Sequence, residues 1–272
     1  MIELWNFLLY KPLLNALIYL YGLLFNNFGL AIIVLTIFLR LILVPLTLPS
    51  LRTAKKMREL APELEKLKSK YKNDRQKLAQ AQMELYRRHG ASPTAGCLPQ
   101  IIQLIILIAL YRAFIGVLQT GGGEVAAKLN QLLYSPLRLA EGTIINTNFL
   151  YLDLAKPDVF RLPGFPIPLP GFVLIAAALV QFISSKMMQP IVAQSQKVAV
   201  KTETKKDDLG TSLQSQMLYL FPLITIFIGY SFPSGLILYW FIFSFSTALQ
   251  QYFVSGFGGL EPWLKKLNFL RK

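Results

Sequence analysis

The chain has 272 residues, of which 54% are hydrophobic and 15% are charged, and its net charge is +14. Soluble domains carry roughly 25% charged residues, so this composition with its long apolar runs argues against a soluble fold. The single cysteine, Cys97, excludes an intrachain disulfide, and with the single histidine, His89, it leaves almost no ligands for a transition metal. We therefore expect no metal site, no cofactor and no cysteine-based chemistry.

Residues 1–27 are predicted to form an amphipathic helix that lies on the outer membrane surface. Lys11 and Pro12 interrupt the apolar pattern, while Trp5 is typical of a membrane interface. A sixth membrane span over residues 2–25 is the alternative. The basic start and small-residue cleavage site of a signal peptide are not evident.

Five apolar segments are predicted to span the membrane in an all-α polytopic fold, since a span needs about 20 apolar residues. They cover residues 28–50, 97–118, 171–189, 215–231 and 235–254. Between and after them we expect a helical hairpin over 51–92, an outer loop over 119–170, a cytoplasmic loop over 190–214 and a basic tail over 255–272. One side holds 21 lysines and arginines and the other holds five. The positive-inside bias thus predicts a cytoplasmic C-terminus and an N-terminus outside.

The 51–92 segment has the pattern of two antiparallel amphipathic helices. Apolar residues recur at helical spacing on one arm, from Leu60 to Tyr71, and Asn73 or Asp74 can serve as N-cap of the second arm. The hairpin carries many basic residues, including Arg52, Lys55, Lys56, Arg58, Arg87 and Arg88. Composition alone leaves two readings: a solvated spacer, or a surface that receives chains, ribosomes or anionic headgroups.

Arg40 is the most informative residue, because it lies about 18 Å along the first apolar run at about 1.5 Å per residue. A charge at that depth costs about 3 kcal/mol on insertion scales, and arginine cannot neutralise itself. Every acidic residue falls outside the five runs, so a buried ion pair or proton relay is disfavoured. A hydrated concavity with one positive charge is the simplest remaining account.

Neutral polar side chains recur on the other predicted spans and could line the same concavity. They are Thr36, Gln103, Gln181, Trp240, Ser244 and Thr247, and the last three share one helical face. Ordinary hydrogen-bonded packing between helices is the alternative for any one of them. The set offers no nucleophile–base pair, which argues against covalent catalysis.

The ordered motifs of the chain resemble those of the YidC insertase family, whose relatives include the mitochondrial Oxa and chloroplast Alb proteins. The resemblance covers nearly the whole chain and rests on Gly29–Ile33, Arg40–Leu46, Pro62–Tyr71, His89–Gly90, Gly96–Pro99, Ala109–Arg112, Phe149–Leu154, Lys186–Met188, Phe232–Trp240 and Gln250–Gln251. It is closest to the compact bacterial form, without the large outer domain of Gram-negative members. Ser244 stands where the family often has asparagine.

The resemblance implies five core helices around a groove that opens to the cytoplasm and to lipid, in a bacterial plasma membrane. Arg40 would be the groove charge, with Gln181 and Trp240 on its walls, and the hairpin would recruit nascent membrane proteins. The basic tail would help to dock ribosomes, and whether a Sec-type translocon is a partner stays open. The implied function is insertion of nascent hydrophobic proteins without nucleotide hydrolysis, and no enzymatic activity.

Two other functions remain open from the residues themselves. Arg40 could be the binding charge of a small-solute or anion transporter, although the internal repeats common in transporters are not evident. The protein could also chaperone helices without moving their flanks across the membrane. Protection of a substrate tail from protease would separate this last function from insertion.

Overall fold

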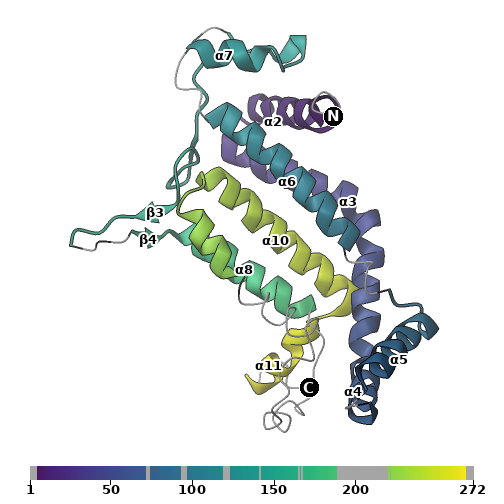
Figure 1. Ribbon diagram of the computed structural model, residues 1–272. Helices are drawn as coiled ribbons and strands as arrows, with labels where there is room; N and C mark the ends of the chain where they lie inside the picture. Colours follow the sequence, from purple (N-terminus) through teal and green to yellow (C-terminus); the bar gives the residue numbers. More distant parts are fainter. Residues whose placement is uncertain are drawn as a thin grey trace. The chain divides into compact units, whose positions relative to one another are not determined.

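The computed structural model describes residues 5–71, 74–92, 97–118, 123–140, 142–164, 166, 168–188, 220 and 222–267. This part of the chain is predominantly helical (Figure 1). It divides into two units, the first being Met1–Leu43, Gln100–Val180 and Pro222–Ser246, and the second Val44–Pro99, Gln181–Phe221 and Thr247–Lys272. The predicted loop 190–214, the start of the predicted span 215–231 and the end of the basic tail lie outside the described residues.

The first two long helices are joined by a tight turn with left-handed backbone. Helix α2 (Lys11–Leu23) follows a short π-helical turn, η1 (Asn6–Tyr10). Helix α3 (Phe28–Glu59) begins after Asn27, whose side-chain oxygen accepts from the Leu30 N–H at 3.0 Å. This N-cap satisfies one of the free amides at the start of the helix. Helix α3 ends at Glu59, nine residues beyond the predicted end at residue 50. Its C-terminal part is polar and helical.

The core of the first unit is formed by α2, the N-terminal half of α3, α6 (Cys97–Leu118) and α10 (Ser234–Ser255). Phe28 lies at its centre, in edge-to-face contact with Tyr21 and Phe114 at centroid distances of 6.1 and 6.3 Å. Helix α2 buries Leu14 and Leu17 completely in this core. It therefore packs one face against the other helices of the unit.

A second contact in the first unit joins α8 (Phe172–Met188) to α10 and to the helical residues 222–229. Leu174, Ala177 and Ile237 form a small buried cluster. A Cβ at Gly229 would overlap the Leu174 side chain, so a glycine lets the two helices approach closely.

Residues 145–171 connect these helices through two short antiparallel strand pairs. Strand β1 (Asn148–Phe149) pairs with β2 (Leu152–Asp153), and β3 (Val159–Phe160) pairs with β4 (Leu169–Pro170). The four strands have two residues each and leave the described chain predominantly helical, which is consistent with the predicted all-α membrane protein. They form because two-residue antiparallel pairs need little regular pattern in a segment that its prolines keep from being helical.

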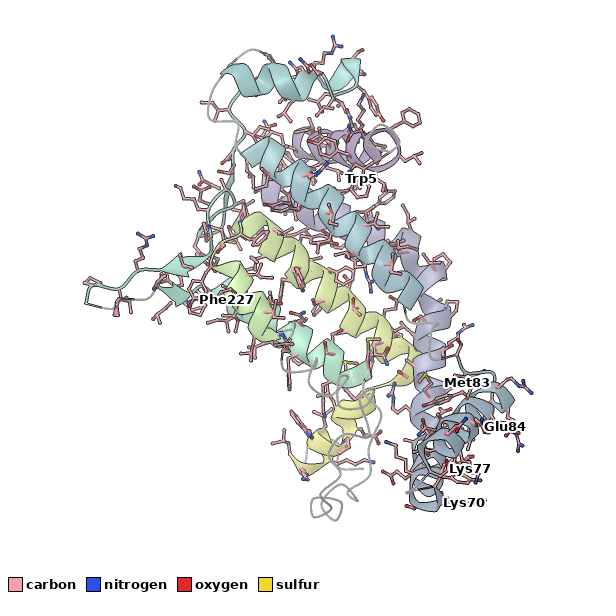
Figure 2. All side chains as sticks on the ribbon, viewed as in Figure 1. Trp5, Lys70, Lys77, Met83, Glu84 and Phe227 are labelled. Carbon is pink, nitrogen blue, oxygen red and sulfur yellow. The ribbon has the colours of Figure 1, made fainter. Side chains whose placement is uncertain are left out.

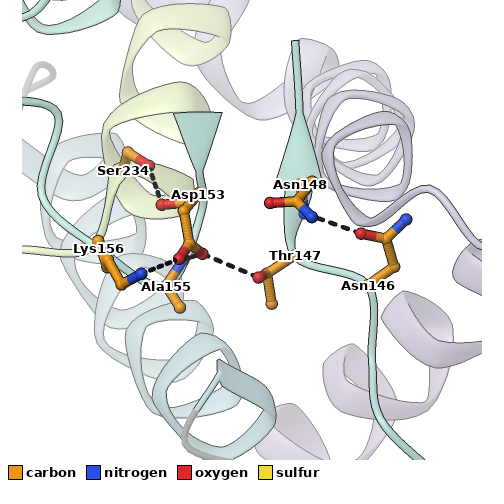
Figure 3. A network of polar contacts seen from close by, with 7 residues as sticks. All are labelled: Asn146, Thr147, Asn148, Asp153, Ala155, Lys156 and Ser234. Atoms are coloured by element: carbon orange, nitrogen blue, oxygen red, sulfur yellow. Dashed lines mark hydrogen bonds and ion pairs between the residues drawn. The ribbon is translucent and has the colours of Figure 1, made fainter. Parts of the chain in front are cut away.

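The first strand pair caps the start of α10 (Figure 3). The Ser234 hydroxyl donates to the Asp153 carbonyl at 2.9 Å, and the Ser234 and Gly235 amides donate to the carbonyls of Lys156 and Leu154. The Asp153 carboxylate in turn accepts from Thr147 and pairs with Lys156 at 2.8 Å each. Amides that a helix N-terminus would leave without partners are thus satisfied.

The second unit contains the hairpin of α4 (Ala61–Lys70) and α5 (Arg75–Arg88). Asp74 is the N-cap of α5, accepting from the Lys77 amide at 3.0 Å, as one of the two predicted alternatives has it. The end of α10 is followed by the short helices η5 (Gly258–Leu260) and α11 (Glu261–Lys266).

Among the described residues, two helices are long and apolar enough to cross a membrane: α3 and residues Ile101–Leu118 of α6. Helix α8 is apolar but has 17 residues, and α10 has 22 residues with a polar stripe. Helix α7 (Gly123–Asn130) and the short η2 (Ser135–Leu137) lie in the predicted outer loop.

Candidate functional site

Arg40 is buried within the first unit, with 8% of its side chain exposed. It projects from the middle of α3, and its guanidinium carbon lies 4.6 Å from the centroid of the Phe243 ring on α10. The face of an aromatic ring carries negative charge density, so this contact partly compensates the buried cation. A permanent positive charge is thereby held against α10.

A hydrogen-bonded pair lies next to Arg40. The side-chain amide of Gln103 on α6 donates to the hydroxyl of Tyr239 on α10. Tyr239 is 3% exposed, and its ring packs against Phe243 at a centroid distance of 6.1 Å. Arg40 and Tyr239, which are buried, and Gln103 and Phe243, which are half-buried, thus form one cluster, which we call the arginine cluster.

Other predicted groove residues of the first unit are more ordinary in their contacts. Thr36 is buried and donates its hydroxyl to the Ile32 carbonyl of its own helix at 2.6 Å. Ser244 is also buried, at 4% exposure, while Trp240 is half-buried. A threonine hydroxyl bonded to its own helix is a packing arrangement, so Thr36 contributes less polarity than the sequence suggested.

Gln181 and Thr247 belong to the second unit and are both half-buried there. The same unit holds a buried polar contact that the sequence did not predict. Arg58 is 8% exposed and donates to the Ser255 hydroxyl at 3.2 Å, and fully buried Gln251 donates to the same hydroxyl at 2.6 Å. This contact ties the polar end of α3 to the end of α10.

Comparison with known proteins identifies the family. Residues 19–258 match the family described as 60Kd inner membrane protein. The chain belongs to this family, that of the YidC insertases. The membrane protein insertase YidC of Fusobacterium nucleatum is 37% identical over 232 residues, covering 84% of this chain and 86% of that protein. Those of Rickettsia prowazekii and Geobacter metallireducens are 28% and 30% identical, over 93% and 92% of this chain.

The chain spans 40% and 37% of the length of the Rickettsia and Geobacter YidC proteins. The family predicted from the motifs is confirmed. The chain is a predominantly helical membrane protein, and its family consists of insertases, which are not enzymes. The apolar helices α3 and α6 agree with that assignment.

The predicted recruitment residues of this YidC-family chain fall into two environments. Arg52, Lys55, Lys56, Arg87 and Arg88 are exposed, whereas Arg58 is buried against Ser255. Figure 2 shows Lys70, Lys77 and Glu84 projecting from the two arms of the hairpin, together with Met83, whose side chain is 59% exposed. The hairpin thus presents basic side chains to solvent with an apolar side chain among them.

Sequence reasoning missed Tyr239, Phe243 and the buried role of Arg58. Tyr239 lies inside the motif Phe232–Trp240. The prediction nevertheless named its neighbour Trp240 as the groove residue, because Trp240 belongs to the polar stripe of the helix. Phe243 was not singled out, because an aromatic residue in an apolar helix is typical of a packed core. The four-residue spacing between Tyr239 and Phe243, which places them on one helical face, is the signal that could have identified them.

Proposed function

We propose that the protein is a membrane protein insertase that uses the charge of Arg40 to attract the polar flank of a nascent hydrophobic protein. One observation carries the proposal: this member of a family of insertases holds a permanent cation, Arg40, in the middle of the apolar helix α3. Such a charge is costly in a membrane, and intramembrane charged residues are functional candidates for that reason.

The mechanism follows from electrostatics and needs neither nucleotide nor cofactor. A groove that opens to the cytoplasm, walled by the arginine cluster and by Trp240 and Ser244 of the same unit, would hold the polar flank transiently. The apolar segment of the substrate would then leave sideways into lipid. The membrane potential assists transfer of an acidic flank at about 2.3 kcal/mol per charge per 100 mV.

We further propose that the hairpin α4–α5 receives substrates in the cytoplasm. Its exposed basic residues attract acidic segments, and exposed Met83 offers a flexible apolar contact, as methionine does on promiscuous surfaces. The basic tail would add contact with the ribosome, through the phosphates of ribosomal RNA. Whether a Sec-type translocon assists is decided by reconstitution without it.

The test is insertion by the purified protein in liposomes that lack other proteins. A single-span substrate with an acidic tail is translated outside them, and protease protection of the tail is measured for the wild type, R40Q and R40K. An attraction of about 1 kcal/mol changes occupancy roughly fivefold, so we expect R40Q to lose most protection and R40K to retain much of it.

Two controls give the result its meaning. R112Q makes the same change at an exposed arginine of α6 and should insert normally. A substrate with a neutral tail should depend less on Arg40, and equal loss for both tails would contradict the electrostatic mechanism. Substrate bound without tail protection would favour a helix chaperone, and release of trapped small anions through the protein would favour a transporter.

A further inference from the structure

Three aromatic rings gather at the start of α8, and all remain accessible. Tyr151, Phe160 and Phe172 contact one another at centroid distances of 6.0, 5.9 and 5.3 Å. Their side chains are nevertheless 46%, 37% and 70% exposed. Leu162, two residues beyond Phe160, is a further 47% exposed, and we call these four residues the aromatic face. An exposed apolar patch of this kind marks a contact surface.

The aromatic face continues the exposed apolar stripe of α8. Phe172, Ile175 and Leu179 lie three and four residues apart, on one helical face, with Ile175 at 40% and Leu179 at 57% exposure. In a membrane protein an exposed aliphatic stripe on an apolar helix faces lipid tails. The aromatic face therefore lies where that lipid-facing stripe reaches the end of the helix.

Polar contacts at the N-terminus of α8 hold the Tyr151 ring in place, and the other two rings pack against it. The Tyr151 hydroxyl donates to the Asp158 carboxylate at 3.1 Å and accepts from the Val173 amide at 2.9 Å. Asp158 is 3% exposed and also accepts from the Leu174 amide at 2.9 Å. A Cβ at Gly171 would overlap Asp158, so glycine permits this approach. The aromatic face is preorganised and is not a loose loop.

The chemistry of the surroundings suits a lipid headgroup region. Tyrosine combines an apolar ring with a polar end and is enriched at membrane interfaces. Arg161, directly after Phe160, is exposed, and Lys156 is 76% exposed beside its partner Asp153. The exposed cation of Arg161 follows Phe160 directly and can reach lipid phosphates, while both carboxylates of this segment, Asp153 and Asp158, are engaged in hydrogen bonds.

We propose that the aromatic face of Tyr151, Phe160, Leu162 and Phe172 is a membrane anchor that sits in the lipid headgroup interface at the N-terminal end of α8. It fixes the depth of α8 in the bilayer and goes beyond insertion itself, because it concerns lipid and not substrate. The same anchoring is expected in the resting protein with no substrate present.

The experiment places an environment-sensitive NBD fluorophore on single cysteines of the full chain in liposomes, after Cys97 has been replaced by alanine. The test position is L162C. L179C on the lipid-facing stripe of α8 is the lipid control, and Q80C, exposed on α5, is the water control. Quenching is measured with lipids that carry a nitroxide near the headgroup or deep in the acyl chain.

We expect the label at L162C to be quenched several-fold more strongly than that at Q80C, and more by the shallow nitroxide than by the deep one. Quenching as weak as at Q80C would overturn the proposal. A blue-shifted emission without quenching by either lipid would also overturn it, since protein would then cover the aromatic face. L169C, on the paired strand at 41% exposure, repeats the test if L162C perturbs folding.

Discussion

Gly29 illustrates how a single residue positions a whole segment. It is buried near the start of α3, and a Cβ there would overlap the ring of Phe149 on β1. The absence of a side chain thus lets the first strand pair lie directly against α3. The placement of Arg40 likewise depends on one neighbour, because the ring of Phe243 covers its guanidinium.

We expect G29A to lower the free energy of unfolding by about 1–3 kcal/mol, as overpacking does in a closely packed site. G22A is the matched control, because nothing lies within 4 Å of a Cβ at Gly22. Its effect should be neutral or stabilising by up to about 1 kcal/mol, because alanine favours a helix more than glycine does. Equilibrium unfolding in mixed micelles measures both, and equal effects would refute the role of the Phe149 contact.

At the scale of elements, the 145–171 segment links three helices of the first unit. It packs Phe149 on α3, caps α8 through Asp158 and caps α10 through Lys156 and Leu154. The amides at the starts of α8 and α10 therefore find their acceptors in one connecting segment. Such caps contribute about 1 kcal/mol each and depend on the geometry of the segment.

The carboxylate of Asp153 makes this linkage sensitive to acid. Burial raises its pKa, but hydrogen bonds from Lys156, Thr147 and the Ala155 amide more than offset this and hold the pKa below its usual value. A carboxylate whose pKa is lower in the folded than in the unfolded protein stabilises the fold. This stabilisation is fully present above the unfolded pKa of about 3.9, and it is lost as the pH falls through the lower pKa of the folded protein.

Unfolding of D153N and the wild type is therefore compared between pH 7 and pH 3. We expect D153N to be less stable at neutral pH, with the difference shrinking below about pH 4. E84Q, which removes an exposed ion pair with Arg88, should differ little from the wild type at any pH. A D153N deficit that stays constant down to pH 3 would contradict the linkage.

At the scale of the whole molecule, charge distribution predicts the orientation in the membrane. Twenty-one lysines and arginines lie on the predicted cytoplasmic side and five on the other. The hairpin α4–α5 and the C-terminus should accordingly be cytoplasmic, with residues 119–170 outside.

Single cysteines at Gln80 and Ala140, both exposed, test this orientation in the chain with Cys97 replaced by alanine. A membrane-impermeant maleimide should label A140C in intact cells and Q80C only after the membrane is permeabilised. Labelling of both after permeabilisation shows that each site is reactive. Reaction of Q80C in intact cells would invert the predicted orientation.

Local and periodic features were accessible to sequence reasoning. The sequence by itself determined that apolar helices alternate with basic segments, that Asn73 or Asp74 is the N-cap of α5, and that a permanent charge lies in the apolar part of α3. These properties depend on composition and on helical spacing over a few residues. The family could be identified as well, because its motifs follow one another in order along the chain.

Only the tertiary structure decided which residues meet across the fold. It brought Phe243 onto Arg40 and Gln103 to Tyr239, buried Arg58 against Ser255, and gathered three aromatic rings at the start of α8. The Arg58 and Ser255 side chains meet across 197 residues of sequence. Packing selects such partners by shape and by hydrogen-bond geometry, which no local periodicity records.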